Sequence, residues 1–96
     1  MSFQIFFHPE TLRDLSQVLE NIKKRIDEAI QNRLTTAPPL YGKPLRGELL
    51  NLWSLRVDDY RVIYKMKKDA VIVLRIVHRS NAYHAGILET RDRAIL

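Results

Sequence analysis

The period of the hydrophobic pattern changes partway along this chain, and the change restricts the folds open to it. From Pro9 to about Leu34, apolar residues recur at helical spacing with no glycine or proline inside the run. From Leu50 to Val77, apolar and polar residues alternate as they do in half-buried strands. Helices followed by consecutive strands predict an α+β fold, with the helices packed on a small, antiparallel-rich sheet.

The N-terminal part is predicted to hold a strand and two helices. Phe3–Phe7 is short, apolar and aromatic, which favours a buried strand, and Pro9 suits the first position of a helix. A single helix over the whole periodic segment would be too long for a core of this size. We therefore predict an αα-hairpin broken near Leu19–Asn21, with Asn21 as a helix cap.

Three strands are predicted in the second half, after a surface connection. The connection, Thr35–Gly47, holds most of the prolines and glycines of the chain. The strands are expected at Leu50–Val57, Tyr60–Lys67 and Ala70–Val77. A short helix after Tyr83 completes the predicted order β-α-α-β-β-β-α.

The first hairpin has a predictable register. A two-residue turn at Asp58 and Asp59 places Val57 opposite Tyr60 and Arg56 opposite Arg61. With that pairing, the apolar residues of both strands fall on one side of the sheet.

The third strand needs a turn of odd length if its arginines are to avoid the core. An odd turn over Lys67–Asp69 puts Ile72, Leu74 and Ile76 on the core face. Val71 and Val73 then lie on the opposite face. An even turn would bury Arg75, and an unpaired buried charge costs several kcal/mol, so we predict the odd turn.

Four arginines are then expected on one sheet face with no acid between them: Arg56, Arg61, Arg75 and Arg79. Like charges on opposed strand positions destabilise a sheet, and a bound anion relieves that repulsion. Arginine binds phosphate through two parallel hydrogen bonds and stays charged at any working pH. The alternative is that these side chains pair with Asp58, Asp59 or Glu48, or extend into solvent.

Composition narrows the class of protein. Ninety-six residues are expected to form one domain, 1–96, and 16 Lys and Arg against 11 Asp and Glu give a net charge of +5. Such a charge suits a polyanionic partner, either nucleic acid or an acidic protein. The absence of cysteine and of any long apolar run favours a soluble cytoplasmic protein without membrane contact.

No residue pattern indicates a metal site, a cofactor or a serine nucleophile, and we expect no cofactor. RNA can still be cleaved, because it carries its own 2′-hydroxyl nucleophile. The protein then has only to orient that group, neutralise the phosphate and move protons. His84, beside Tyr83, is the histidine best placed for proton transfer.

Several spaced motifs in this chain resemble the RelE/ParE toxin superfamily. They are the run KPLRGELLNLWSLRVDDYRVIYK, beginning at Lys43, and the strand VIVLRIVHR, followed by Tyr83. The resemblance implies a compact toxin of a type II toxin–antitoxin system, neutralised by an antitoxin protein. RelE-like members are ribosome-dependent endoribonucleases that cut messenger RNA.

The resemblance also implies roles for individual residues. Arg61, Arg79 and Tyr83 match the catalytic positions, where two arginines support the transition-state phosphate and a tyrosine stacks on a base and takes part in proton transfer. Arg46 and Arg56 match positions that contact the RNA backbone. Together with the basic residues of the same region, the expected RNA-binding set is Arg46, Arg56, Lys43, Lys65, Arg75 and His84.

The chain departs from the best-known RelE proteins at one point. Leu52 and Ser54 occupy positions where those proteins carry lysines, so the general base is left open between Lys65, Lys43 and His84. Two alternative functions share the fold: a ParE-like inhibitor of DNA gyrase without ribonuclease activity, and an inactive module that only binds an antitoxin.

Overall fold

A computed structural model describes residues 2–45, 51–81 and 85–94, and these residues form a five-stranded sheet in the order β1-β5-β4-β3-β2. β1 runs parallel to β5, and the other neighbouring strands are antiparallel. The fold is therefore α+β with an antiparallel-rich sheet, as predicted. The strands are β1 (Gln4–Phe7), β2 (Lys43–Pro44), β3 (Leu52–Val57), β4 (Tyr60–Lys67) and β5 (Ala70–His78).

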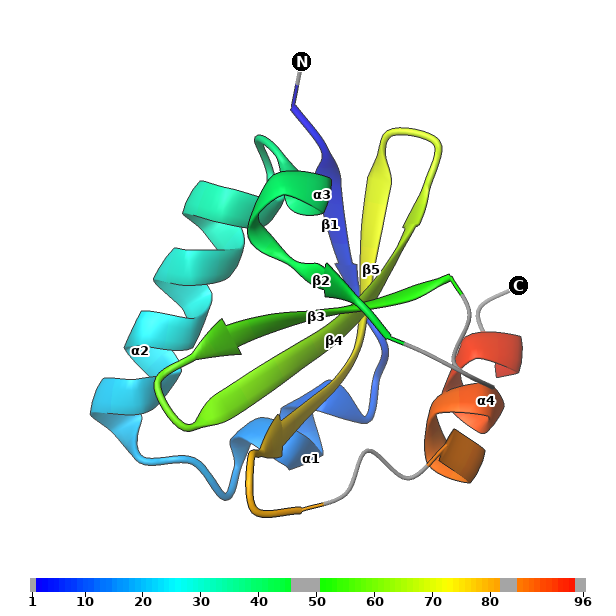
Figure 1. Cartoon of the computed structure of the whole chain (residues 1–96). Coiled ribbons are helices and arrows are strands. Elements are labelled where there is room, and N and C mark those ends of the chain that lie inside the picture. The colour runs from blue at the N-terminus through cyan, green and yellow to red at the C-terminus, as the bar shows by residue number, and fades with distance from the viewer. Residues whose placement is uncertain (1, 46–50, 82–84, 95–96) are drawn as a thin grey trace.

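The helices lie on both sides of this sheet, with α2 and α4 on opposite sides in Figure 1. In the described part of the chain, no helix is both long and apolar enough to cross a membrane. α2 continues directly into a π-helical turn, η1. The helical elements are α1 (Thr11–Leu15), α2 (Glu20–Ala29), η1 (Ile30–Leu34), α3 (Pro38–Tyr41) and α4 (Ala85–Ala94).

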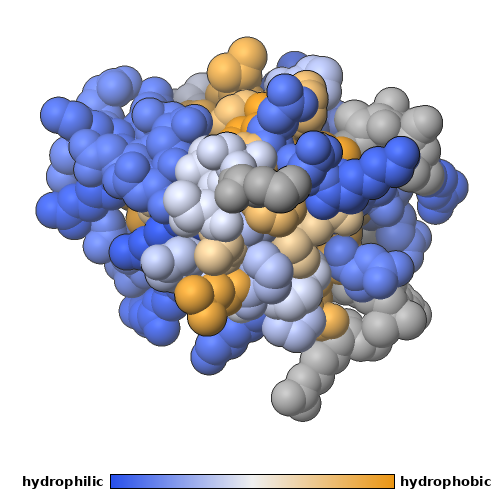
Figure 2. Space-filling model, turned by 90° about the horizontal axis from the view of Figure 1, so that it is seen from above, coloured by the Kyte–Doolittle hydropathy of each residue, from blue (hydrophilic) through white to orange (hydrophobic). Residues whose placement is uncertain are grey.

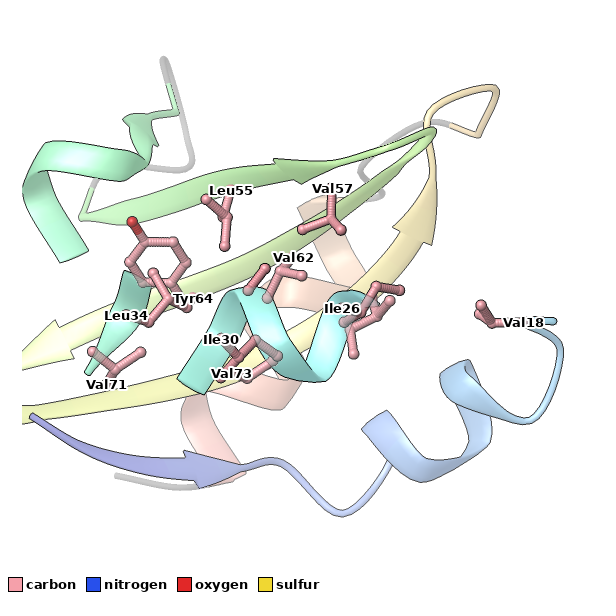
Figure 3. Packing of buried hydrophobic residues seen from close by; sticks show 12 residues of the cluster. Val18, Ile26, Ile30, Leu34, Leu55, Val57, Val62, Tyr64, Val71 and Val73 are labelled. Atoms are coloured by element: carbon pink, nitrogen blue, oxygen red, sulfur yellow. The ribbon is translucent and has the colours of Figure 1, made fainter. Parts of the chain in front are cut away.

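The larger hydrophobic core lies between the sheet and the helical run α2–η1. Ile26, Ile30 and Leu34 follow the helical period and are at most 1% exposed. They pack against inward-facing residues of three strands, including Leu55 and Val62 (Figure 3). This packing stabilises the sheet that carries Arg56 and Arg61.

A smaller core lies on the opposite face of the sheet, under α4. Leu88 of α4 is fully buried there against Leu52, Ile63 and Leu74. The sheet is thus covered on both faces along part of its length. The face predicted to carry four arginines with no acid between them is partly closed by this helix.

The odd turn predicted between β4 and β5 is wrong, although the parity of Arg75 is right. The turn has two residues, since Lys67 pairs with Ala70. A β-bulge between Ile63 and Tyr64 leaves Leu74 as an extra residue in β5, so that Arg75 pairs with Ile63. The bulge therefore places Arg75 on the predicted face of the sheet, although the turn has a different length from the one predicted.

The two-residue turn reverses the predicted faces of the β5 residues that come before the bulge. Val71 and Val73 lie in the larger core, whereas Ile72 and Leu74 belong to the cluster under α4. Ile76, beyond the bulge, is in the larger core as predicted. Both faces are apolar here because both are covered by helices.

The N-terminal elements differ from prediction in three respects. β1 is an edge strand rather than a buried one, and Phe6 and Phe7 are 51% and 43% exposed. The helical break lies between Leu15 and Glu20, and Leu19 rather than Asn21 is the N-cap of α2. α1 starts at Thr11, because the hydroxyl and amide of Thr11 donate to the carbonyl of His8 and close a turn before the helix.

The connection predicted over Thr35–Gly47 contains structure of its own. α3 begins at Pro38, and proline is favoured at the start of a helix. β2 then pairs with β3, and adds a fifth strand that was not predicted. This addition decides where Lys43 lies.

Candidate nucleic-acid interface

Lys43, Arg56 and Arg61 meet at a groove on the sheet face that α4 leaves open. The groove encloses about 480 Å³, within the size range of sites for small ligands. Its walls come from α3, β2, β3 and β4, and its lining residues are Tyr41, Lys43, Pro44, Leu45, Ser54, Arg56 and Arg61.

Strand register brings these cations together. Lys43 pairs with Ser54, which was not predicted, and Arg56 pairs directly with Arg61, as predicted. Alternate residues of a strand share a face, so Ser54 and Arg56 lie on the same side of β3. The three cations are therefore neighbours on one surface, although they come from three strands.

Arg56 lies at the boundary between this groove and a second cavity. It is exposed, and its Nε atom donates to the carbonyl of Asp58 at 3.4 Å, a long hydrogen bond. The second cavity is also lined by Arg25 and Arg33 of the helical run, although Arg25 is paired with Asp58 at 3.1 Å. Basic side chains thus continue from the groove around the end of β3.

Arg79 follows β5, and it interacts with an acid. Its amide donates to the carbonyl of Asp59, and its Nε atom lies 3.3 Å from the Asp59 carboxylate. Both side chains are more than half exposed, so this pair contributes little to stability. The prediction that no acid lies among the arginines is therefore wrong at Arg79. Pairing with Asp59 was the stated alternative.

Lys65 does not reach the groove. Its Nζ atom lies 2.5 Å from Asp92 of α4, and its side chain is only 12% exposed. The ion pair ties α4 to the sheet, so Lys65 has a structural contact rather than an open position for RNA.

Arg75 of β5 lies apart from the groove as well, beside α1. It lines a cavity with Arg13 and Asp14 of α1 and with Tyr60 and His78. Burial lowers its pKa, and the nearby carboxylate of Asp14 opposes that effect. Arg75 therefore has the predicted strand parity, which it shares with Arg61, but it does not line the groove that Arg56 and Arg61 share.

The two positions that lack the expected lysines have different surroundings. Leu52 is 4% exposed and packs in the cluster beneath α4, where a lysine would be buried. Ser54 is 8% exposed and lies in the lining of the groove. Three further predicted residues, Arg46, Tyr83 and His84, lie outside the described residues.

Tyr41 lines the groove but was not predicted as a site residue. It is 48% exposed at the end of α3, directly before Gly42 and the strand of Lys43. The only sequence signal is an aromatic residue beside a Gly-Lys pair in a proline-rich segment. Among the residues that the structure describes, no three His, Asp or Glu side chains form a group able to hold a metal ion.

Comparisons with known proteins agree on one family. The family model for ParE toxins of type II toxin–antitoxin systems matches residues 5–83. The toxin RelG of Mycobacterium tuberculosis is 32% identical over 85 residues, which is 86% of this chain and 98% of that protein. The toxin RelE of the same organism is 37% identical over 73 residues, which is 74% of this chain and 75% of that protein.

A solved structure agrees with this assignment. The crystal structure of the toxin–antitoxin complex RelBE2 from M. tuberculosis contains a chain that matches with a TM-score of 0.78 and 31% identity. The match covers 82% of this chain and 100% of that chain.

Proposed function

The chain belongs to the family of ParE toxins of type II toxin–antitoxin systems, and we propose that it acts in the cytoplasm as an endoribonuclease that cleaves messenger RNA. The observation that carries this proposal is the meeting of Lys43, Arg56 and Arg61 at one groove. Three cations within one small groove match the charge of an RNA backbone. Two guanidinium groups from adjacent strands can hold the oxygens of one phosphate from different directions.

Cleavage in this groove uses the 2′-hydroxyl of the RNA as the nucleophile. The 2′-oxygen forms a bond to the phosphorus, and the bond from phosphorus to the 5′-oxygen of the next nucleotide breaks. The 2′-hydroxyl loses its proton, and the departing 5′-oxygen gains one. The products are a 2′,3′-cyclic phosphate and a 5′-hydroxyl, and neither step needs a metal ion.

The protein contributes charge and position to this reaction. Arg61 and Arg56 stabilise the negative charge that increases on the phosphate oxygens in the transition state. Lys43 adds a third positive charge from β2. The resemblance alone assigns Arg79 a similar role and Tyr83 a role in base stacking and proton transfer.

Two macromolecular partners belong to the proposal. The RelBE2 structure is a toxin–antitoxin complex, and we propose that an antitoxin protein binds and neutralises this chain too. We also propose that the ribosome presents the messenger RNA, because the groove contains few catalytic groups and a reaction of this kind gains most from positioning.

The proposal is tested by expressing the chain without an antitoxin and comparing two arginine substitutions. Arg61→Ala is expected to relieve growth arrest while the purified variant stays folded. Arg13→Ala is the matched control, because Arg13 is 80% exposed on α1 and does not line the groove. Equal toxicity of Arg61→Ala and the wild type would show that the site is wrong.

Inhibition of DNA gyrase is a second candidate, because the matching family model is that of ParE toxins. Growth arrest with intact messenger RNA and loss of gyrase supercoiling activity would establish that function in place of RNA cleavage. Tyr83→Phe separates the two functions further, since it should reduce only RNA cleavage.

A further inference from the structure

The groove has an apolar side that the phosphate contacts leave unused. Tyr41, Pro44 and Leu45 face the same hollow as Lys43, Arg56 and Arg61. Tyr41 is 48% exposed, whereas Tyr64 is fully buried. An exposed aromatic ring beside several cations is the combination with which proteins bind single-stranded nucleic acid.

The backbone next to Tyr41 is held in place by a buried contact. The Tyr64 hydroxyl donates to the carbonyl of Pro38 at 2.7 Å, and the amide of Gly42 donates to the same carbonyl. Figure 3 shows the Tyr64 hydroxyl directed from the core toward α3. A Cβ atom on Gly42 would lie 1.8 Å from the Tyr64 oxygen, so this close approach requires glycine.

These contacts restrict the position of Tyr41 before any ligand binds. α3 has only four residues, Pro38–Tyr41. It is tied to the sheet at its first residue by Tyr64 and, one residue after its end, by β2. A side chain on a backbone that is already fixed loses less conformational entropy when a ligand stacks on it.

We infer that Tyr41 forms a nucleobase-binding subsite with Pro44 and Leu45, next to the phosphate-binding cations of the groove. This inference rests on the proposed RNA-binding function and deepens it. A base stacks on the Tyr41 ring while its own backbone phosphate contacts Arg56 and Arg61. The volume of about 480 Å³ suits a ligand of nucleotide size better than a longer stretch of RNA.

The test measures binding of two oligonucleotides to the full chain by fluorescence anisotropy. One is a single-stranded 2′-O-methyl RNA of about eight nucleotides, which cannot be cleaved because its nucleophile is blocked. The other has the same sugar–phosphate backbone without bases. Tyr41→Ala should weaken binding of the first about tenfold and leave binding of the second unchanged.

Matched variants separate stacking from charge and from folding. Tyr41→Trp should bind the base-containing oligonucleotide at least as tightly as the wild type, because stacking is retained. Leu40→Ala alters the exposed neighbour of Tyr41, 77% accessible and outside the groove lining, and should have no effect. Arg61→Ala should weaken both oligonucleotides and reduce the slope of log K against log[salt] by about 0.7, whereas Tyr41→Ala leaves the slope unchanged.

Three results would overturn the inference: equal binding by Tyr41→Ala and the wild type, equal weakening of both oligonucleotides by Tyr41→Ala, or no binding by the wild type. Its failure is distinct from failure of the proposed function. If the chain cleaves RNA in cells but Tyr41→Ala binds normally, only the subsite is wrong. If base-dependent binding is found without cleavage, the subsite stands and the nuclease proposal fails.

Discussion

At the scale of single residues, the contact between Tyr64 and Gly42 links the hydrophobic core to the groove. Tyr64 is fully buried, and its hydroxyl is satisfied by the Pro38 carbonyl. Burial raises the pKa of Tyr64 to about 12, so the phenol stays neutral and continues to donate at any physiological pH. A change at either residue is therefore expected to affect the stability of the chain and the position of β2.

Gly42→Ala is expected to destabilise the protein by about 3 kcal/mol, as overpacking of a rigid site does. Tyr64→Phe alone should cost about 1 kcal/mol, for the lost hydrogen bond. In the double variant the costs should not add, because removal of the hydroxyl leaves the ring carbon Cζ, 2.8 Å from the new Cβ, as the nearest atom. Urea unfolding of the four proteins measures the coupling, and strictly additive costs would contradict the close approach.

The raised pKa of Tyr64 also leads to an expectation for the free energy of unfolding at high pH. Its pKa is about 12 in the folded chain and about 10 when unfolded. The folded state therefore holds the proton more tightly, so the contribution of Tyr64 is complete below pH 10 and is lost as the pH rises toward 12. The difference in unfolding free energy between the wild type and Tyr64→Phe should shrink over this interval. A difference that is constant from pH 8 to 12 would contradict the burial of the phenol.

The groove was partly predictable from sequence at this scale. The two-residue turn and the alternation of polar and apolar residues were enough to place Arg56 opposite Arg61. Tyr41 could not be found in the same way, because β2 is only two residues long and carries no alternation. Lys65 was predicted to bind RNA, but its partner Asp92 comes from α4, whose docking position has no local signal.

At the scale of elements, α4 is held on the sheet by Arg91. Its guanidinium donates to both oxygens of Asp14 in α1, at 2.7 and 3.2 Å, and to the carbonyl of Leu74 at 2.8 Å. Leu74 is the bulged residue, and has no partner in β4. Asp14 accepts a further hydrogen bond from the amide of Ile76. The bulge, α1 and α4 thus form one connected polar cluster.

Arg91→Ala is expected to destabilise the chain by about 3 kcal/mol, because it leaves the Asp14 carboxylate, 11% exposed, without the guanidinium that donates to both of its oxygens. Arg93→Ala on the same helix is the control, since Arg93 is 75% exposed and its pair with Glu89 spans 3.6 Å. That change should stay within about 0.5 kcal/mol. Similar urea midpoints for the two variants would show that the Arg91 cluster does not anchor α4.

The apolar run that comes before the bulge explains why the faces of part of β5 could not be predicted. From Ala70 to Leu74 every residue is apolar, so alternation cannot tell one face from the other. Beyond the bulge, Arg75 and Ile76 differ in polarity, and there the predicted faces are right. An apolar run of this kind is expected of a strand buried on both sides, and here the second cover is α4.

At the scale of the whole molecule, the basic groove lies on the part of the sheet face that α4 does not cover. Figure 2 shows hydrophilic residues gathered over the α2 side, on the left, with hydrophobic residues reaching the surface between them toward the middle. The chain carries a net charge of +5. For binding of single-stranded RNA, log K should therefore fall linearly as log[salt] rises. An affinity that is independent of salt would argue against contacts to the RNA backbone.

The chemical form of RNA ends after expression tests the central claim most directly. If the RNA's own 2′-hydroxyl attacks in this groove, induction of the wild-type chain should cut messenger RNA into fragments with characteristic ends. The downstream fragment should begin with a 5′-hydroxyl, and the upstream fragment should end in a 2′,3′-cyclic phosphate. Induction of Arg61→Ala should produce few of them, and Arg13→Ala as many as the wild type. Growth arrest without new RNA ends, or new ends that carry a 5′-phosphate, would contradict the account.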